Sequence, residues 1–174
     1  MSKGNHHRSA GNWVEIYQTA IINKLFDEFW PRIFRCLNEC NYDLLWVRPN
    51  PNCNSIANLL LHLEGNMRQW IISGIGGEPD NRRRSEEFEQ NQGFSVEEFK
   101  GKFEILKQEL LDVFNRLTEE DLLKMYRIQH FHLSGIGVVL QATEHFSYHL
   151  GQITFLVKSY KDIDTKYYDS PNLD

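Results

Sequence analysis

Apolar residues recur every three or four positions along four long stretches of this 174-residue chain. Such spacing gathers them on one face of a helix, and that face has to be buried against another element. The stretches cover roughly residues 12–37, 54–73, 95–114 and 136–160. Four long amphipathic helices and little else predict an all-α fold, a four-helix bundle formed as one domain over residues 12–160.

Capping residues and a proline locate the ends of these helices. The second helix is expected to begin at Asn54 or Ser55, both of which are favourable N-cap residues. The third opens with Ser95 and Glu98, the two members of a capping box. Pro31 interrupts the first apolar stripe, which continues beyond it, so we expect a kink or a break at that point.

Two connecting segments have a different character. Residues 74–93 are rich in Gly, Arg, Glu and Asn, and they predict a long, mobile surface loop between the second and third helices. Acidic residues follow the basic run 82–84 in this loop, so we interpret that run as solvated. Residues 126–133 alternate with period two, which predicts an extended stretch that crosses the bundle.

Both ends of the chain are polar. Residues 1–11 predict a flexible N-terminal tail, and the adjacent His6 and His7 within it would bind a metal only weakly, since such a pair must first be ordered. Residues 161–174, which include Pro171, predict a polar, frayed C-terminal tail.

Composition and charge exclude several classes of protein. A formal net charge of −5 argues against nucleic-acid binding, which relies on basic surfaces. No run of about 18 apolar residues and no apolar N-terminal leader is present, so we expect no membrane association. Cys36, Cys40 and Cys53 are few and unpaired in spacing, which favours free thiols in a reducing compartment and a cytoplasmic location.

Two histidines in the fourth helix suggest a metal site. His145 and His149 are four residues apart, so they lie about 40° apart on one helix face and can converge on one ion. The small Ala142 shares that face, which indicates that the pair points into the bundle. Two buried histidines bonded to backbone carbonyls would produce the same pattern, so the pair alone leaves both interpretations open.

His62 strengthens the metal interpretation. It stands on the inner face of the second helix, beside Leu59 and Leu63, where a polar ring costs free energy unless something binds it. One ion explains three inward histidines more simply than three separate hydrogen-bond partners. The Glu-x-x-His pattern of di-iron bundles and the HExxH pattern of thermolysin-like proteases are both absent, and no inward carboxylate is evident.

These segments resemble the DinB/YfiT-like superfamily. The resemblance lies in NSIANLLLHLEGN at residues 54–66 and HFSYHLGQI at residues 145–153, and it extends from about Trp13 to Tyr160. Its specific part is a lone histidine in the second helix with His-x-x-x-His-x-Gly-Gln in the fourth. The resemblance implies a four-helix bundle, three histidine ligands, one divalent metal ion such as zinc or nickel, and a homodimer.

Other side chains near the three histidines are candidates for supporting roles. Asn66 and Gln152 share faces with the ligands and can either hydrogen-bond to a ligand or substrate or join two helices. His130 and His132 lie on one side of the extended stretch, where either could cover the metal and relay protons. Glu144 is next to His145 but points about 100° away, so we expect it at the surface.

Two functions are compatible with this set of residues. Three imidazoles leave a coordination position open, where a metal-bound water or a thiol would be activated. The first hypothesis is therefore a metal-dependent hydrolase or small-thiol transferase, activities that the resemblance also implies, acting on a small molecule that the sequence does not identify. The alternative is a non-catalytic bundle that binds a metal or a small ligand, because no catalytic base stands out in the sequence.

Overall fold

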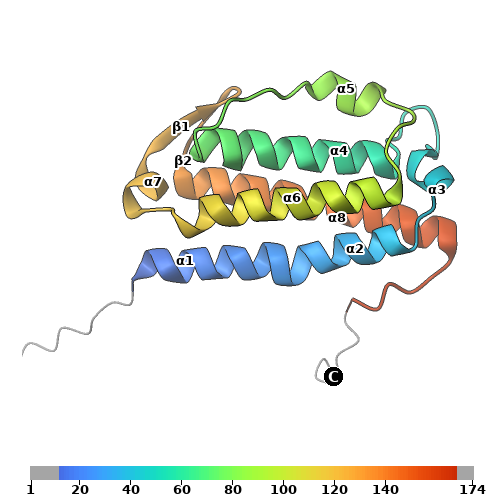
Figure 1. The fold of residues 1–174 in the computed structure, drawn as a ribbon, viewed down its shortest axis with the longest axis horizontal. Coiled ribbons are helices and arrows are strands. Elements are labelled where there is room, and N and C mark those ends of the chain that lie inside the picture. Colours follow the sequence, from blue (N-terminus) through green and yellow to red (C-terminus); the bar gives the residue numbers. More distant parts are fainter. Residues whose placement is uncertain (1–11, 168–174) are drawn as a thin grey trace, which may run out of the picture.

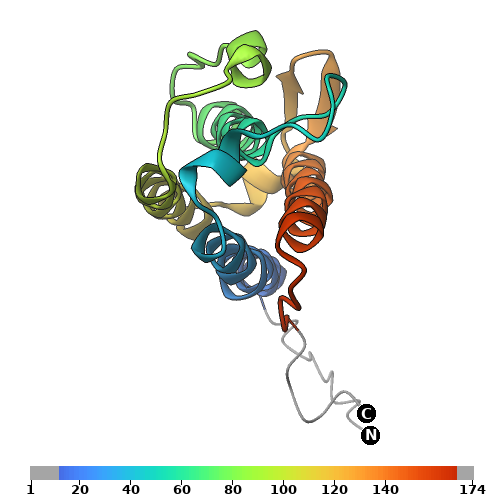
Figure 2. The same ribbon diagram turned by 90° about the vertical axis from the view of Figure 1, so that its right-hand side faces the viewer.

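The computed structural model describes residues 12–167, in which four helical columns form a bundle (Figure 1). The columns are α1 (Trp13–Ile22), η1 (Asn23–Phe29) and α2 (Trp30–Asn38); α4 (Ile56–Met67) and η2 (Arg68–Ile75); α6 (Val96–Asn115); and α8 (Gly135–Lys161). The α4 column packs on α6 and α8, and the first column contacts the same two helices from the other side, as the end-on view in Figure 2 shows. The predicted all-α four-helix bundle is confirmed.

Short elements complete the fold between these columns. They are α3 (Tyr42–Trp46), α5 (Arg84–Glu89), α7 (Glu119–Leu123), β1 (Met125–Ile128) and β2 (Phe131–Ser134). Among residues 12–167, no helix has both the length and the apolar character needed to cross a membrane.

The second and third helices begin at the predicted caps. The side chain of Ser55 accepts a hydrogen bond from the N–H of Asn58, and the Asn58 side chain accepts one from the N–H of Ser55. Ser95 and Glu98 make the same reciprocal pair. Each pair satisfies two amides that the first helical turn would otherwise leave without partners.

The first column passes Pro31 without a break. Immediately before the proline, η1 is π-helical, and the N–H of Trp30 donates to the carbonyl of Leu25, five residues back. A proline has no N–H, and its ring crowds the carbonyl four residues earlier. A wider π turn gives that ring room, so the predicted disturbance takes the form of a π-helical segment.

Aromatic rings fill the centre of the bundle and set the rotation of α8. The ring of Phe146 lies parallel to that of Phe29, with centroids 5.9 Å apart, and is stacked on Trp30 at 5.2 Å. Trp30 also contacts Phe103 at 5.6 Å, and all four side chains are buried. Because Phe146 is the immediate neighbour of His145, this stack determines which way the histidine face of α8 points.

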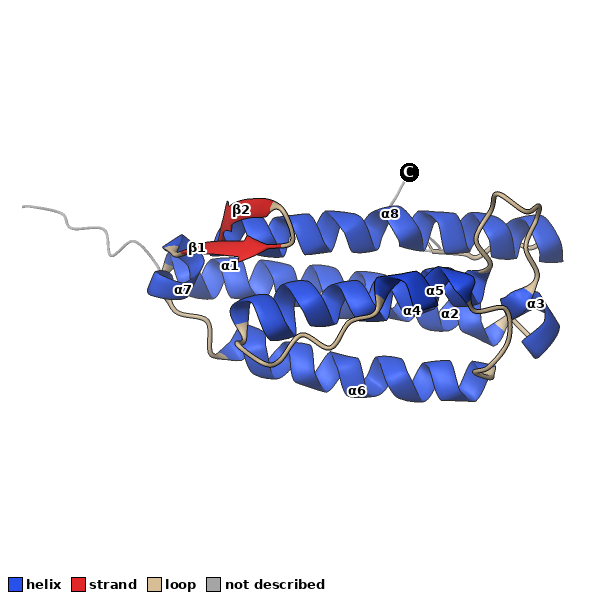
Figure 3. Cartoon of the chain, turned by 90° about the horizontal axis from the view of Figure 1, so that it is seen from above, coloured by secondary structure: helices blue, strands red, loops and turns tan. Residues whose placement is uncertain are grey.

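The long connection between the second and third helices lies along α4, and we call its residues 77–94 the strap. Figure 3 shows the short helix α5 of the strap lying over α4. The Asn58 side chain of α4 donates to the carbonyls of Glu87 (2.9 Å) and Gln90 (2.7 Å). The strap is therefore attached to the bundle by polar contacts, instead of forming the free loop that its composition suggested.

The basic run 82–84 was only partly interpreted correctly. Arg83 and Arg84 are exposed, as expected. Arg82 is different, because only 4% of its side chain is exposed and it forms an ion pair with Glu87. The acidic neighbours that made the run look solvated include the carboxylate that allows Arg82 to be buried.

The alternating segment 126–133 forms strands but does not cross the bundle. β1 and β2 pair antiparallel, with Met125 opposite Ser134 and Ile128 opposite Phe131. The reversal occurs at Gln129, whose φ of 54° lies in the left-handed region. The hairpin therefore returns to its starting point and packs against η2 and the beginning of α8.

Part of the C-terminal tail is attached to the bundle. The hydroxyl of Tyr167 lies 2.9 Å from both Cys36 Sγ and Thr154 Oγ1, and Thr165 is buried. Burial raises the pKa of the Cys36 thiol. All three cysteines are free, as predicted. The predicted N-terminal tail, with His6 and His7, lies outside the described residues.

Candidate metal centre

Three histidines from two helices meet between α4 and α8. The ring centroids of His62 and His145 are 5.0 Å apart, those of His62 and His149 4.9 Å, and those of His145 and His149 4.5 Å. One nitrogen from each ring can be chosen so that all three lie within 4.8 Å of one another. This is the convergence that the four-residue spacing on α8 and the inward position on α4 predicted.

The donor set fits a divalent transition metal. Around a tetrahedral ion with Zn–N distances of about 2.0–2.1 Å, two ligand nitrogens lie roughly 3.3 Å apart. The Nε2 atoms of His62 and His145 lie 2.8 Å apart and the three ligand nitrogens lie within 4.8 Å of one another, so side-chain adjustments on the ångström scale would bring them to that spacing. Among residues 12–167, this cluster contains imidazoles alone, and imidazole suits zinc, nickel, copper and iron.

The outer nitrogen of His149 has a partner on its own helix. Its Nδ1 lies 2.6 Å from Oε1 of Gln152, and an amide oxygen only accepts, so Nδ1–H donates. The lone pair of that imidazole is then on Nε2. The structure thus places Gln152, a predicted supporting residue, where it fixes the protonation pattern of a candidate ligand.

The outer nitrogen of His62 contacts two residues of the strap that sequence reasoning missed. Its Nδ1 lies 2.8 Å from Oε2 of Glu87 and 3.0 Å from Nη2 of Arg82. The ring of Phe88 lies against the same imidazole, with centroids 4.8 Å apart. Charged residues in a segment without apolar periodicity gave no signal that they would be buried beside a histidine.

Burial keeps the imidazoles of α8 neutral. It lowers the pKa of His145 from 6.5 to about 4, and the charges of His149, His62, Arg82 and Arg84 act in the same direction. Burial also lowers the pKa of His149, while the hydrogen bond to Gln152 opposes that shift. Both rings are therefore neutral at pH 7, which is the protonation state that metal ligation requires.

The metal-free protein is expected to lose about 1–2 kcal/mol of stability between pH 7 and pH 5 through His145. Its pKa is about 4 when folded and 6.5 in the unfolded reference, so the unfolded chain binds more protons between these values. The contribution of His145 to the free energy of unfolding is thus complete above pH 6.5 and falls as the pH drops toward 4. Urea unfolding with a chelator present, at both pH values, measures the loss. In His145→Gln the free energy of unfolding should depend less on pH. If that variant lost as much stability between pH 7 and pH 5 as the wild type, His145 would not be the cause of the loss.

The remaining predicted residues lie in three different settings. Asn66 is 7% exposed, and its Oδ1 is buried without a hydrogen-bond partner among the described residues. His130 lies at the hairpin turn against Phe131, and His132 is exposed on β2, so the structure does not bring either into the three-histidine cluster. Glu144 is exposed, as predicted.

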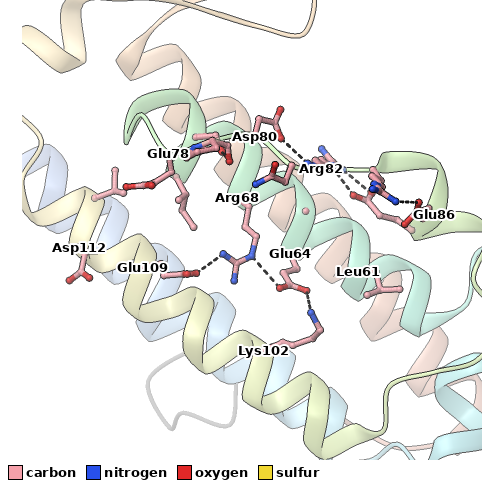
Figure 4. A pocket seen from close by; sticks show the side chains of 18 of the residues that line it. Leu61, Glu64, Arg68, Glu78, Asp80, Arg82, Glu86, Lys102, Glu109 and Asp112 are labelled. Atoms are coloured by element: carbon pink, nitrogen blue, oxygen red, sulfur yellow. Dashed lines mark hydrogen bonds and ion pairs between the residues drawn. The ribbon is translucent and has the colours of Figure 1, made fainter.

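A cleft of about 840 Å³ lies beside the cluster, between α4, α6 and the strap. Across it, Glu64 pairs with Lys102 and Arg68, and Arg68 reaches on to Glu109 (Figure 4). None of the three histidines lines this cleft, but Arg82 and Glu87 do. That ion pair is the link between the cleft and His62.

Comparisons with known proteins agree with this fold. None of the curated proteins compared with the chain matches it. The crystal structure of a DinB-like protein from Bacillus subtilis, YjoA, is similar, with a TM-score of 0.65 and 14% sequence identity over 83% of this chain and 94% of that one. At this identity the likeness concerns the fold, which is that of the DinB-like proteins. The family model described as a protein of unknown function, DUF1572, matches residues 13–171, and the chain therefore belongs to that family.

Proposed function

We propose that this protein binds one divalent metal ion, zinc or nickel, through His62, His145 and His149. The observation that carries the proposal is the convergence of three buried or half-buried imidazoles from two helices. Two of them, His62 and His149, have their outer nitrogens engaged by Glu87 and Gln152. Engagement of the outer nitrogen is what orients metal-binding histidines in proteins.

Three protein ligands support an open, reactive site. Structural zinc sites are closed by four protein ligands, whereas catalytic ones keep a position for water or substrate. A metal bound here would lower the pKa of a water or displace the proton of a small thiol. We propose hydrolysis or thiol transfer on a small molecule on this basis. The Oδ1 of Asn66, which has no hydrogen-bond partner among the described residues, would accept a hydrogen bond from the substrate.

One observation favours the non-catalytic alternative. Glu87 is a carboxylate beside the cluster, but it is a poor general base. Burial acts to raise its pKa, yet the hydrogen bonds and charges of Arg82 and His62 together outweigh burial and leave the pKa below its ordinary value. A binding protein needs no base, so assays of metal-loaded protein for ester, phosphoester and thiol-transfer turnover decide between the two functions.

Protein produced without a polyhistidine tag is expected to contain about one transition-metal ion per chain. Elemental analysis after gel filtration measures it. The His62→Ala, His145→Ala double variant should lose the metal because it removes two of three ligands, while His132→Ala should keep it because His132 lies outside the cluster. Equal metal content in the double variant and the wild type would contradict the assignment.

Two further predictions from the sequence concern assembly and location. A homodimer is implied by the resemblance, and the exposed Leu140, Tyr148 and Phe155 on α8 offer apolar surface for it. The homodimer and the cytoplasmic location stay predictions.

A further inference from the structure

We infer that Glu87, clamped by Arg82, is the positioning residue of His62, holding its proton on Nδ1 and so making Nε2 the metal-binding nitrogen. The inference rests on the proposed metal site. The strap lies outside the four columns, and by this inference it determines which nitrogen of His62 binds the ion.

The hydrogen-bonding possibilities at Nδ1 of His62 leave one consistent arrangement. Oε2 of Glu87 lies 2.8 Å away and Nη2 of Arg82 3.0 Å away. A carboxylate only accepts and a guanidinium only donates, so Nδ1 can bond to one of them and not to both. A protonated Nδ1 can only donate a hydrogen bond to the carboxylate, and an unprotonated Nδ1 can only accept one from the guanidinium.

The contacts of Arg82 decide between these partners. Its Nε lies 2.6 Å from Oε1 of Glu87 and its Nη2 2.8 Å from Oε2, a two-point pairing that directs one N–H of each nitrogen to the carboxylate. The second N–H of Nη2 has an acceptor in the backbone carbonyl oxygen of His62, 3.5 Å away, so Arg82 does not need a bare Nδ1 as a partner. The Arg82 side chain is 4% exposed and always charged, so Glu87 has to be ionised to balance it. Nδ1–H of His62 then donates to Oε2, and the lone pair is left on Nε2, facing His145.

The backbone of α4 is shaped to receive this ion pair. A Cβ added to Gly65 would overlap Oε1 of Glu87 and would come within 3.0 Å of Nε of Arg82. The glycine therefore lets the paired side chains lie directly on the helix, one turn from His62. Asn58 holds the other side of the strap through the carbonyls of Glu87 and Gln90.

Zinc affinity, measured by competition with a chromogenic chelator, tests the inference. Loss of a group that orients a metal ligand typically lowers affinity about 10–100-fold, and we expect that loss for Glu87→Ala. Glu87→Gln keeps an accepting oxygen and should lie between that variant and the wild type. Glu86→Ala is the matched control, because the exposed Glu86 pairs with Arg83 at the surface and should leave affinity unchanged.

Gly65→Ala tests the same contact without removing any polar group. Its methyl group should push the Glu87 carboxylate away from His62 and lower zinc affinity, as Glu87→Ala does. Gly101→Ala controls for the substitution, since a Cβ there meets nothing within 4 Å. Should Glu87→Ala fail to fold, this pair of variants still decides the question.

A metal-free measurement separates this inference from the proposed function. Imidazole ¹⁵N shifts should show His62 protonated at Nδ1 in the wild type and redistributed toward Nε2 in Glu87→Ala. If the wild type binds no zinc, the proposed metal site is wrong, and these shifts still report on Glu87. Protonation at Nε2 in the wild type, or equal zinc affinity in Glu87→Ala and Glu86→Ala, would overturn the inference.

Discussion

Saturation with zinc is expected to raise the melting temperature of this protein by about 8–16 °C over the chelated form. At a free-ion concentration 1,000 times the dissociation constant, binding adds about 4.1 kcal/mol to the folded state. For a domain of this size, 1 kcal/mol corresponds to about 2–4 °C. Calorimetry or circular dichroism with zinc and with a chelator measures the difference.

The chelated protein should remain a folded bundle. The stack of Phe29, Trp30 and Phe146 and the rest of the apolar core lie outside the cluster and do not depend on an ion. Its far-ultraviolet helix signal should therefore persist, and melting should stay cooperative. His149→Ala should show little zinc-dependent shift. A chelated protein without helix would instead make the metal a structural requirement.

Phe146→Ala is expected to destabilise the protein by about 3–5 kcal/mol, as a large cavity in a packed core does. The ring is fully buried and stacked against both Phe29 and Trp30, so its removal leaves a cavity among closely packed side chains. Denaturant unfolding at constant pH, in the presence of a chelator, measures the change without a contribution from metal.

Ile105→Ala on α6 provides the control. Ile105 is 59% exposed, and the loss of its side chain should change the free energy of unfolding by no more than about 0.5 kcal/mol. Similar effects for the two substitutions would mean that the packing of α8 against the first column is not as described.

The features predictable from the sequence are those with a local signature. Periodic apolar residues predicted the four columns. Ser55 was one of two predicted N-caps, and the predicted pair of Ser95 with Glu98 lies within one helical turn. The histidine cluster could be predicted from the sequence for the same reason. His145 and His149 share a face by spacing alone, and His62 lies on a face that the neighbouring leucines mark as buried.

What the sequence did not reveal depends on contacts between distant residues. Glu87 is 25 positions from His62, and its segment has the composition of solvated loops, because a buried ion pair leaves no hydrophobic period. The hairpin and the extended crossing predicted for residues 126–133 share the same alternation, and only the left-handed Gln129 distinguishes them. Likewise, Pro31 predicts an irregularity in the first column, but the sequence does not show that this irregularity is a π-helical turn.

The polar attachment of the strap has a consequence for the rate at which the proposed metal ion would be released. While Glu87 holds Nδ1 of His62, that ring cannot rotate away from the cluster. Dissociation of the ligand thus requires local opening of the strap, an event that breaks a few hydrogen bonds and leaves the aromatic core intact. The residence time of the proposed ion would then be set by this local opening and not by global unfolding, so the metal would be exchanged between this protein and its surroundings without loss of the fold.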